Sequence, residues 1–267
     1  MKIIPFENSF MKETDCVITI GAFDGLHLGH QKIIKDTVNL AKEKNAKSVV
    51  ITFNTNPKMA TSSMVFSKPL MMEEDENDFY KKMGIDYLSI IDFSKKMSKL
   101  TGVEFIAELC KLYRIQAMII GKDFKCGSKE HSVSALKIKD LVKDFAFGAP
   151  VLLEDFVVNS DKAIISSSLV RTKLHEGKIN VVNSLLGRHY CLNTKNTRFK
   201  YENGMMTIFT DSFMQFVPKD GQYKTKVIAG KKVFEDLNVI ISGSCLSFQL
   251  SESVEPDRIY FLRSNQE

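Results

Sequence analysis

The sequence predicts an α/β protein in which a Rossmann-like parallel sheet is followed by a small antiparallel β domain. In the first part, β-rich runs alternate with segments whose apolar residues recur at helical spacing, as in doubly wound sheets. From residue 191 onward, short β-like runs are separated by turn residues, which is typical of an antiparallel sheet or barrel. At 267 residues the chain is long enough for two domains, which we expect over residues 1–187 and 188–267.

Four runs rich in Val and Ile are expected as strands of the parallel sheet. They are residues 16–20, 48–53, 87–91 and 117–120. After the first run, apolar residues at positions 33, 34, 38 and 41 fall on one helical face. The other predicted helices are 73–83, which ends at Gly84, then 102–113 and 133–145. Ligands of such sheets bind at the carboxyl ends of the strands, so the loops there are the first place to look for a site.

The second domain is predicted from five short runs: 205–209, 222–227, 239–242, 246–250 and 258–262. The pairs Asn203-Gly204 and Asp220-Gly221 are turn signals within this part of the chain. We therefore expect a small antiparallel sheet or barrel.

Residues 20–30, Ile-Gly-Ala-Phe-Asp-Gly-Leu-His-Leu-Gly-His, connect the first strand to its helix and contain the strongest motif. The glycines let the backbone turn tightly and let a ligand approach its N–H groups, and the helix start favours an anion such as a phosphate. His27 and His30 stand about one helical turn apart, so both imidazoles can donate hydrogen bonds and offer positive charge to the oxygens of a reacting phosphate as negative charge builds there. The alternative is a glycine turn with two surface histidines. No third ligand stands at a supporting spacing, so we expect no metal site in the protein itself.

The block 19–31 resembles the opening motif of the bacterial FAD synthetases, within the HxGH nucleotidyltransferase superfamily. The resemblance covers about residues 15–190 and implies transfer of AMP from MgATP to FMN, which gives FAD and pyrophosphate. It implies that His27 and His30 are catalytic. The ATP-binding residues that it implies in this block are Gly21, Ala22, Phe23, Asp24 and Gly29.

A second family motif is similar to residues 164–171, Ile-Ile-Ser-Ser-Ser-Leu-Val-Arg. Ser167 and Ser168, with their N–H groups, are expected to hold phosphate oxygens of ATP. Arg171, one turn further, is expected to offer its planar fork of donors to the β and γ phosphates and counts as catalytic. The alternative is a helix N-cap followed by a surface arginine.

Two further loops are expected to border the flavin and nucleotide pocket. In residues 121–127, similar to the family's Gly-x-Asp/Asn-Phe-x-Phe-Gly motif, Asp123 can accept a hydrogen bond and Phe124 offers an apolar wall, while Cys126 replaces the second Phe. An ordinary Asp turn is the alternative. In the long loop 54–70, Asn56 and Pro57 stand where the family has His-Pro of a Pro-His-Pro flap. A plain surface loop is the alternative there.

In most FAD synthetases a riboflavin kinase domain follows the first domain. Residues 218–223 resemble one of its strands, but the kinase run Gly-x-Pro-Thr-Ala-Asn is absent from the sequence. We therefore expect a degenerate β-barrel-like domain without kinase activity. Two other functions stay open: nucleotidyl transfer to another phosphate-bearing substrate, and flavin or nucleotide binding without catalysis.

Composition and charge are ordinary for a soluble globular protein, which we expect in the cytoplasm, and the charge is most simply that of a solvated surface. The net charge of +5 is scattered, with no basic patch interleaved with aromatic residues, so we expect no nucleic-acid partner. The five cysteines form no CxxC pair, which indicates reduced thiols. We find no signal-like segment and no apolar run of the roughly 18–20 residues that a membrane helix needs. The expected partners are nucleotides and flavins with Mg²⁺ carried by ATP, while the oligomeric state stays open.

Overall fold

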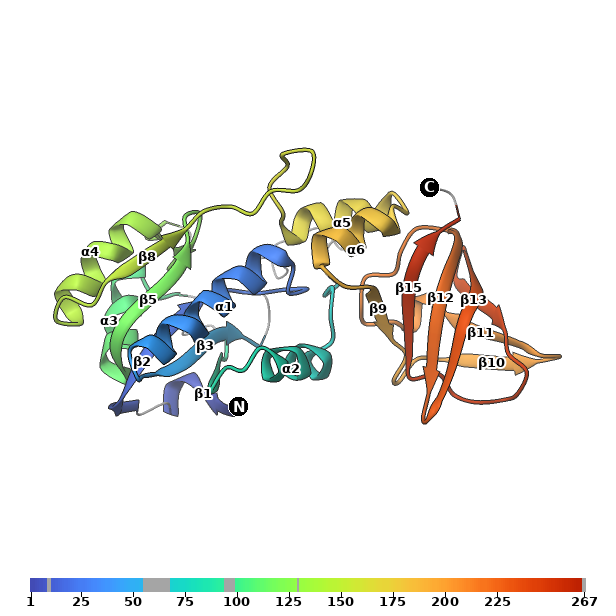
Figure 1. Cartoon of the computed structure of the whole chain (residues 1–267), viewed down its shortest axis with the longest axis horizontal. Helices are drawn as coiled ribbons and strands as arrows, with labels where there is room; N and C mark the ends of the chain where they lie inside the picture. The colour runs from blue at the N-terminus through green and yellow to red at the C-terminus, as the bar shows by residue number, and fades with distance from the viewer. Residues whose placement is uncertain (9–10, 55–67, 94–98, 129, 266–267) are drawn as a thin grey trace. The chain divides into compact units, whose positions relative to one another are not determined.

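The computed structural model of the chain describes residues 1–8, 11–54, 68–93, 99–128 and 130–265 (Figure 1). The chain divides into two compact units. The first unit consists of Met1–Phe23, Gly29–Thr61 and Asn77–Val157, and the second of Asp24–Leu28, Ser62–Glu76 and Val158–Glu267.

A six-stranded sheet, parallel throughout, lies in the first unit, which confirms the Rossmann-like prediction. The strand order is β1-β4-β3-β2-β5-β8. The strands are β1 (Lys2–Pro5), β2 (Met11–Ile20), β3 (Lys47–Phe53), β4 (Tyr87–Ile91), β5 (Tyr113–Gly121) and β8 (Val151–Glu154). The four predicted runs are the four central strands. The edge strands β1 and β8 were not predicted, because four-residue strands at an edge carry little hydrophobic pattern.

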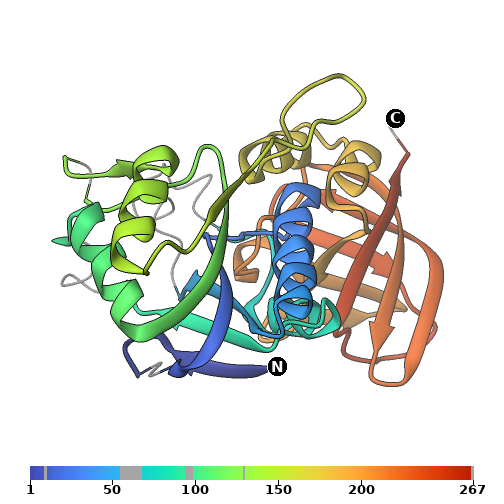
Figure 2. The same cartoon turned by 60° about the vertical axis from the view of Figure 1, so that its left-hand side comes forward.

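Helices cover both faces of this sheet (Figures 1 and 2). They are α1 (Leu28–Glu43), α2 (Glu73–Lys82), α3 (Gly102–Leu112) and α4 (Ala135–Phe145). Alternate residues of β2 serve opposite faces, as the pleat of a strand requires. Cys16 and Ile18 pack in the main core with α3 and α4, whereas Val17 packs with Ala41 of α1. All three of these β2 residues are completely buried.

The chain changes direction across the sheet at β2. From β2 it passes through α1 to β3 on one side, while β5 lies on the other side of β2. The loops that follow β2 and β5 therefore leave the sheet at a topological switch point, where open α/β sheets bind their ligands. These loops begin at Gly21 and after Gly121.

An antiparallel sheet of seven strands lies in the second unit, as predicted. Its order is β10-β11-β14-β13-β12-β15-β9, so β10 and β9 are its two edges. The strands are β9 (Tyr190–Asn193), β10 (Phe199–Glu202), β11 (Met205–Phe209), β12 (Gly221–Ala229), β13 (Lys232–Ser242), β14 (Cys245–Gln249) and β15 (Arg258–Ser264). The predicted turn Asn203-Gly204 joins β10 to β11, with φ of 49° and 79°, the left-handed values that such hairpin turns need. The short edge strands β9 and β10 were again missed.

Two helices, α5 (Ser167–His175) and α6 (Ile179–Leu186), also belong to the second unit. Helix α6 ends at Gly187, whose φ of 66° is left-handed. The domain boundary expected between residues 187 and 188 stays a prediction.

Candidate active site

The loop between β2 and α1 is wound unusually tightly. Phe23, Gly25 and Leu26 have φ values of 46°, 73° and 42°, so three of its residues are left-handed. A Cβ atom at Gly25 would lie 2.8 Å from the side chain of Leu70, so only glycine fits this position without displacement. The predicted order of strand, glycine turn and helix is confirmed.

His27 lies directly before α1 and is only 5% exposed. Burial, and secondarily the positive charge of Arg188, lowers the pKa of His27 to about 4. At neutral pH the imidazole ring of His27 is therefore uncharged, and it can still form hydrogen bonds at the loop. The sequence predicted a positive charge at this position, and the difference comes from desolvation, which the sequence does not display. Its burial also rules out the surface-histidine alternative for this residue.

His30 stands in the first turn of α1 and is half-buried. Its ring meets the edge of the Phe23 ring, with centroids 5.3 Å apart and planes at 85°. Phe23 is 3% exposed, and its ring also lies against Gly21, where an added Cβ would be 3.0 Å from the phenyl Cζ. The left-handed backbone of Phe23 thus places an aromatic ring that orients the His30 imidazole. Ala22 and Gly29, in the same segment, are half-buried.

Arg171 is buried and forms an ion pair with Asp24, which the family resemblance implied as an ATP-binding residue. The guanidinium also donates to the carbonyl oxygen of Lys68 over 3.1 Å. The other carboxylate oxygen of Asp24 accepts the backbone N–H of Leu70 at 2.9 Å. The alternative of a surface arginine is wrong, because the Arg171 side chain is only 7% exposed.

The serines at the start of α5 have different partners. Ser166 is the N-cap, and its hydroxyl accepts the N–H of Leu169 at 3.2 Å. Ser167 donates its hydroxyl to the carbonyl oxygen of Asp24 over 2.9 Å. Ser168 is exposed to solvent in the first turn. Asp24 is thus brought together with Ser167 and Arg171 of α5, which lie 143 and 147 residues further along the chain.

Arg188 holds the same loop and was missed as a site residue. It donates to the carbonyl oxygens of Gly25 over 2.7 Å and Leu26 over 3.0 Å, and it contacts the sulfur of Met71 at 3.4 Å. Burial lowers the pKa of Arg188 to about 10, so it keeps its charge at neutral pH. The available signal was its position in the run Leu-Gly-Arg-His-Tyr, residues 186–190, at the end of the region that resembles the FAD synthetases.

Glu76 of α2 is a second missed residue. Its carboxylate accepts the backbone N–H of Gly25 and lies close to Asp24. Burial first, and then the negative charge of Asp24, raises the pKa of Glu76 to about 8. No sequence signal distinguished it, because it follows three other acidic residues at the start of α2. At neutral pH the Glu76 carboxyl group therefore keeps its proton, next to the loop that carries His27.

Asp123 and Phe124 lie at the carboxyl end of β5 in the first unit. The N–H of Phe124 donates to the carbonyl oxygen of Gly121 over 3.0 Å and closes a turn. Asp123 is exposed, whereas Phe124 is half-buried and packs against the main core. The short strand pair β6 (Lys125–Cys126) and β7 (Val133–Ser134) follows. Asn56 and Pro57 lie outside the residues that the structure describes.

Among the described residues there is no group of three or more His, Cys, Asp and Glu side chains that could hold a metal ion. All five cysteines are free thiols. In the same part of the chain, none of the helices has the length and apolar character needed to cross a membrane.

Comparisons with known proteins bear on the family and the fold of this chain. The FAD synthetase family profile matches residues 9–168. A bifunctional riboflavin kinase/FMN adenylyltransferase of Listeria monocytogenes is 31% identical over 184 residues, covering 68% of this chain and 56% of that protein. An FAD synthetase of the same organism is 26% identical over 210 residues, covering 78% of this chain and 80% of that protein.

A bifunctional relative from Buchnera aphidicola is covered to 61% of its length, so the chain spans little more than half of the bifunctional proteins that it matches. A crystal structure titled macrolide-efflux protein, from Streptococcus pneumoniae, shares the fold with a TM-score of 0.83 over 98% of this chain and 89% of that one, at 20% identity. The match over residues 9–168 covers more than half of the sequence, and this chain belongs to the FAD synthetase family.

Proposed function

We propose that this protein is an FMN adenylyltransferase, in which the phosphate of FMN attacks the α phosphorus of MgATP and FAD and pyrophosphate leave. The observation that carries the proposal is the loop from β2 into α1, with His27 buried before the helix and His30 in its first turn, in a chain of the FAD synthetase family. A helix start favours an anion, and such a loop leaves the sheet where α/β proteins bind nucleotides.

The roles follow from charge and position. His30 donates to a phosphate oxygen as negative charge builds in the transition state, and His27 supports it as a neutral hydrogen-bond donor. Arg171, with Ser167 and Ser168, holds the outgoing pyrophosphate. Because Arg171 is paired with Asp24, phosphate binding has to share or replace that carboxylate.

The remaining predicted residues complete the proposed substrate contacts. Residues for the adenine nucleotide are Gly21, Ala22, Phe23, Asp24 and Gly29, and residues for the flavin and nucleotide pocket are Asn56, Pro57, Asp123 and Phe124. The described residues offer no cluster of metal ligands, so we propose that Mg²⁺ enters as part of MgATP. The attacking FMN phosphate is already anionic near pH 7, so the protein contributes positioning and electrostatics without a general base.

We further propose that the protein lacks riboflavin kinase activity, because the Gly-x-Pro-Thr-Ala-Asn run is absent from its sequence. The proposed partners are nucleotides and flavins, without nucleic acid. Free thiols throughout are typical of the cytoplasm, where we propose that the enzyme works.

The decisive experiment is chromatography of flavins after incubation of the purified protein with ATP and Mg²⁺, with FMN in one tube and riboflavin in another. FAD from FMN and no product from riboflavin is the expected result. FMN or FAD formed from riboflavin would contradict the absence of kinase activity. No product in either tube would overturn the proposal, and thermal-shift screening with other phosphate-bearing acceptors would then separate another transferase from a binding protein.

A further inference from the structure

The segment of residues 68–70, just before α2, contacts both members of the Asp24–Arg171 ion pair. Arg171 donates to the carbonyl oxygen of Lys68 over 3.1 Å. The N–H of Leu70 donates to Asp24, the ion-pair partner of Arg171, over 2.9 Å. This short segment therefore fixes both members of the pair.

The other side of the same segment is bound by residues 213–216, which precede β12. The ammonium group of Lys68 donates to the carbonyl oxygen of Phe213 over 2.6 Å. The N–H of Phe216 donates to the carbonyl oxygen of Pro69 over 2.9 Å, and the Gln215 amide donates to the carbonyl oxygen of Leu70 over 3.3 Å. Residues from the C-terminal part of the chain thus hold the segment that holds the ion pair.

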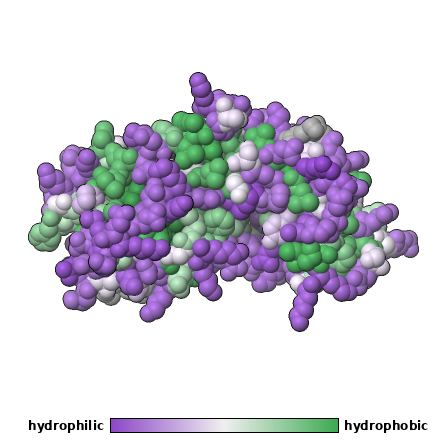
Figure 3. Space-filling model, in the orientation of Figure 1, coloured by the Kyte–Doolittle hydropathy of each residue, from purple (hydrophilic) through white to green (hydrophobic). Residues whose placement is uncertain are grey.

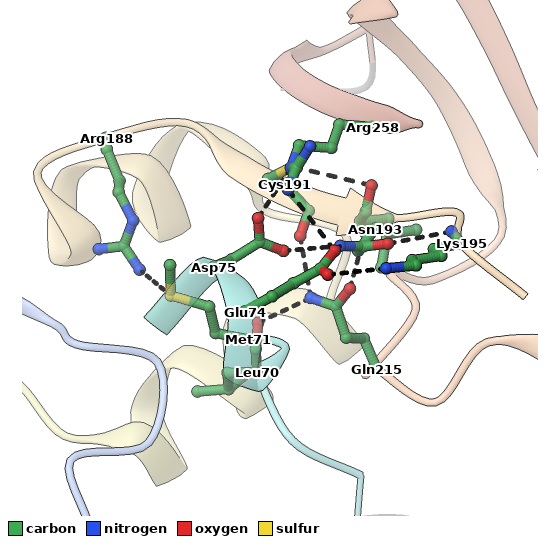
Figure 4. Close-up of polar contacts among 11 residues, drawn as sticks. Leu70, Met71, Glu74, Asp75, Arg188, Cys191, Asn193, Lys195, Gln215 and Arg258 are labelled. Carbon is green, nitrogen blue, oxygen red and sulfur yellow. Dashed lines mark hydrogen bonds and ion pairs between the residues drawn. The ribbon is translucent and has the colours of Figure 1, made fainter. Parts of the chain in front are cut away.

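Gln215 is the central contact of this arrangement (Figure 4). Its side chain is only 1% exposed, and its amide donates also to the carbonyl oxygen of Cys191 over 3.0 Å. Its oxygen accepts the N–H of Asn193 at 2.7 Å. A buried amide whose donors and acceptor are all engaged cannot rotate without losing hydrogen bonds, so its orientation is fixed.

The first turn of α2, which follows this segment, is bound to strands β9 and β15 of the antiparallel sheet. Asn193 donates to the carboxylates of Glu74 over 2.6 Å and Asp75 over 2.9 Å, and Arg258 donates to Asp75 over 2.7 Å (Figure 4). Residues 213–216 therefore hold the segment 68–70 directly. Asn193 and Arg258 hold the start of α2, just after the segment.

We propose that Gln215 is a positioning residue for Arg171, acting through the chain of contacts Gln215, Leu70, Asp24 and Arg171. This inference rests on the proposed function, because it takes Arg171 as a ligand of the ATP phosphates. The Arg171 guanidinium can bind phosphate oxygens well only if its orientation is fixed. That orientation depends on the contacts that hold its carboxylate partner, Asp24. The C-terminal part of the chain then tunes the affinity for ATP without contacting it.

The test compares Gln215→Met, which keeps the volume and removes the amide, with the wild-type protein. We expect KM for ATP and the ATP dissociation constant from calorimetry to rise about five-fold, with KM for FMN unchanged. The matched control is Gln222→Met on β12, an exposed position whose hydrogen bond to Asn265 uses only the backbone. This control leaves all three constants unchanged. If Gln215→Met does not fold, as judged by thermal melting, Gln215→Asn provides the second comparison, because its amide stays polar but is one methylene group shorter and draws back from the Leu70 carbonyl oxygen.

A coupling measurement separates positioning from general loosening of the protein. In an Arg171→Gln background, Gln215→Met should no longer weaken ATP binding, whereas in a His30→Ala background the five-fold effect should persist. Equal ATP affinity for the wild type and Gln215→Met, or an effect that persists without Arg171, would overturn the inference. Wild-type FAD formation would show in either case that the proposed function holds. A wild type that forms no FAD would refute that function, while a loss of ATP affinity that depends on Arg171 would still support the positioning role.

Discussion

Asp24 and Arg171 form an ion pair whose side chains are 6% and 7% exposed, and it joins the turn after the first central strand to a helix 147 residues further along the chain. Removing one member of a buried pair leaves the other charge without compensation. A phosphate bound by Arg171 would supply the missing negative charge.

Asp24→Asn should therefore lower the free energy of unfolding by about 3 kcal/mol without ligand. Pyrophosphate should raise the melting temperature of this variant more than that of the wild type, because it gives the buried guanidinium a counter-charge. Melting curves with and without pyrophosphate measure both effects. Asp211→Asn, which breaks an exposed pair with Arg198, is the control and should change stability by less than about 1 kcal/mol. Equal stabilisation of both proteins by pyrophosphate would contradict the prediction.

His30→Ala should reduce kcat for FAD formation about 100- to 1,000-fold, since it removes a donor to the phosphate oxygens on which negative charge develops. Its half-buried ring contacts Phe23, so the expected cost in stability is only about 1 kcal/mol. Initial rates of FAD formation and a melting curve measure the two effects. His131→Ala, at an exposed position, should retain the wild-type rate. Near-normal turnover of His30→Ala would refute the catalytic assignment.

The buried His27 predicts a loss of stability in mild acid. Its pKa of about 4 in the folded protein lies below the ordinary 6.5, so the unfolded chain binds the proton more readily. Stability attributable to His27 is then fully present above about pH 6.5 and is lost as the pH falls toward 4, by about 3 kcal/mol in total. Urea unfolding of the wild type and His27→Gln at pH 7.5 and pH 5 measures the difference. An identical pH dependence for both proteins would show that His27 is not the group responsible.

Glu76 predicts the opposite trend. Its folded pKa of about 8 lies above the ordinary 4.5, so its favourable contribution is present in acid and is lost as the pH rises through 8. Glu76→Gln mimics the protonated carboxyl and keeps an acceptor for the Gly25 N–H. We expect this variant to exceed the wild type in unfolding free energy by about 5 kcal/mol at pH 9 and by only about 1 kcal/mol at pH 5. Urea unfolding at both pH values tests this, and a variant that is less stable at pH 9 would contradict it.

Sequence alone predicted the elements whose pattern is local. The four central strands of the parallel sheet are continuous apolar runs, and the turn before α1 is marked by its glycines and histidines, so both could be identified without tertiary information. The short strands β1, β8, β9 and β10 were missed, because four residues at a sheet edge or end contain too little periodicity to be distinguished from a loop.

The sequence singled out part of the loop and its surroundings, but it missed Arg188 and Glu76 and did not reveal the states of the residues that it named. His27 and Arg171 stood out by residue type and spacing, whereas the neutrality of one and the carboxylate partner of the other come from burial and from a contact across 147 residues. Arg188 and Gln215 act through backbone carbonyl oxygens, which every residue possesses, so no pattern of side chains could reveal their partners. The residue types and their spacing in the sequence thus indicated side chains that belong to the loop. Only the tertiary packing decided which charged side chains have a partner and which side chains are held in one orientation.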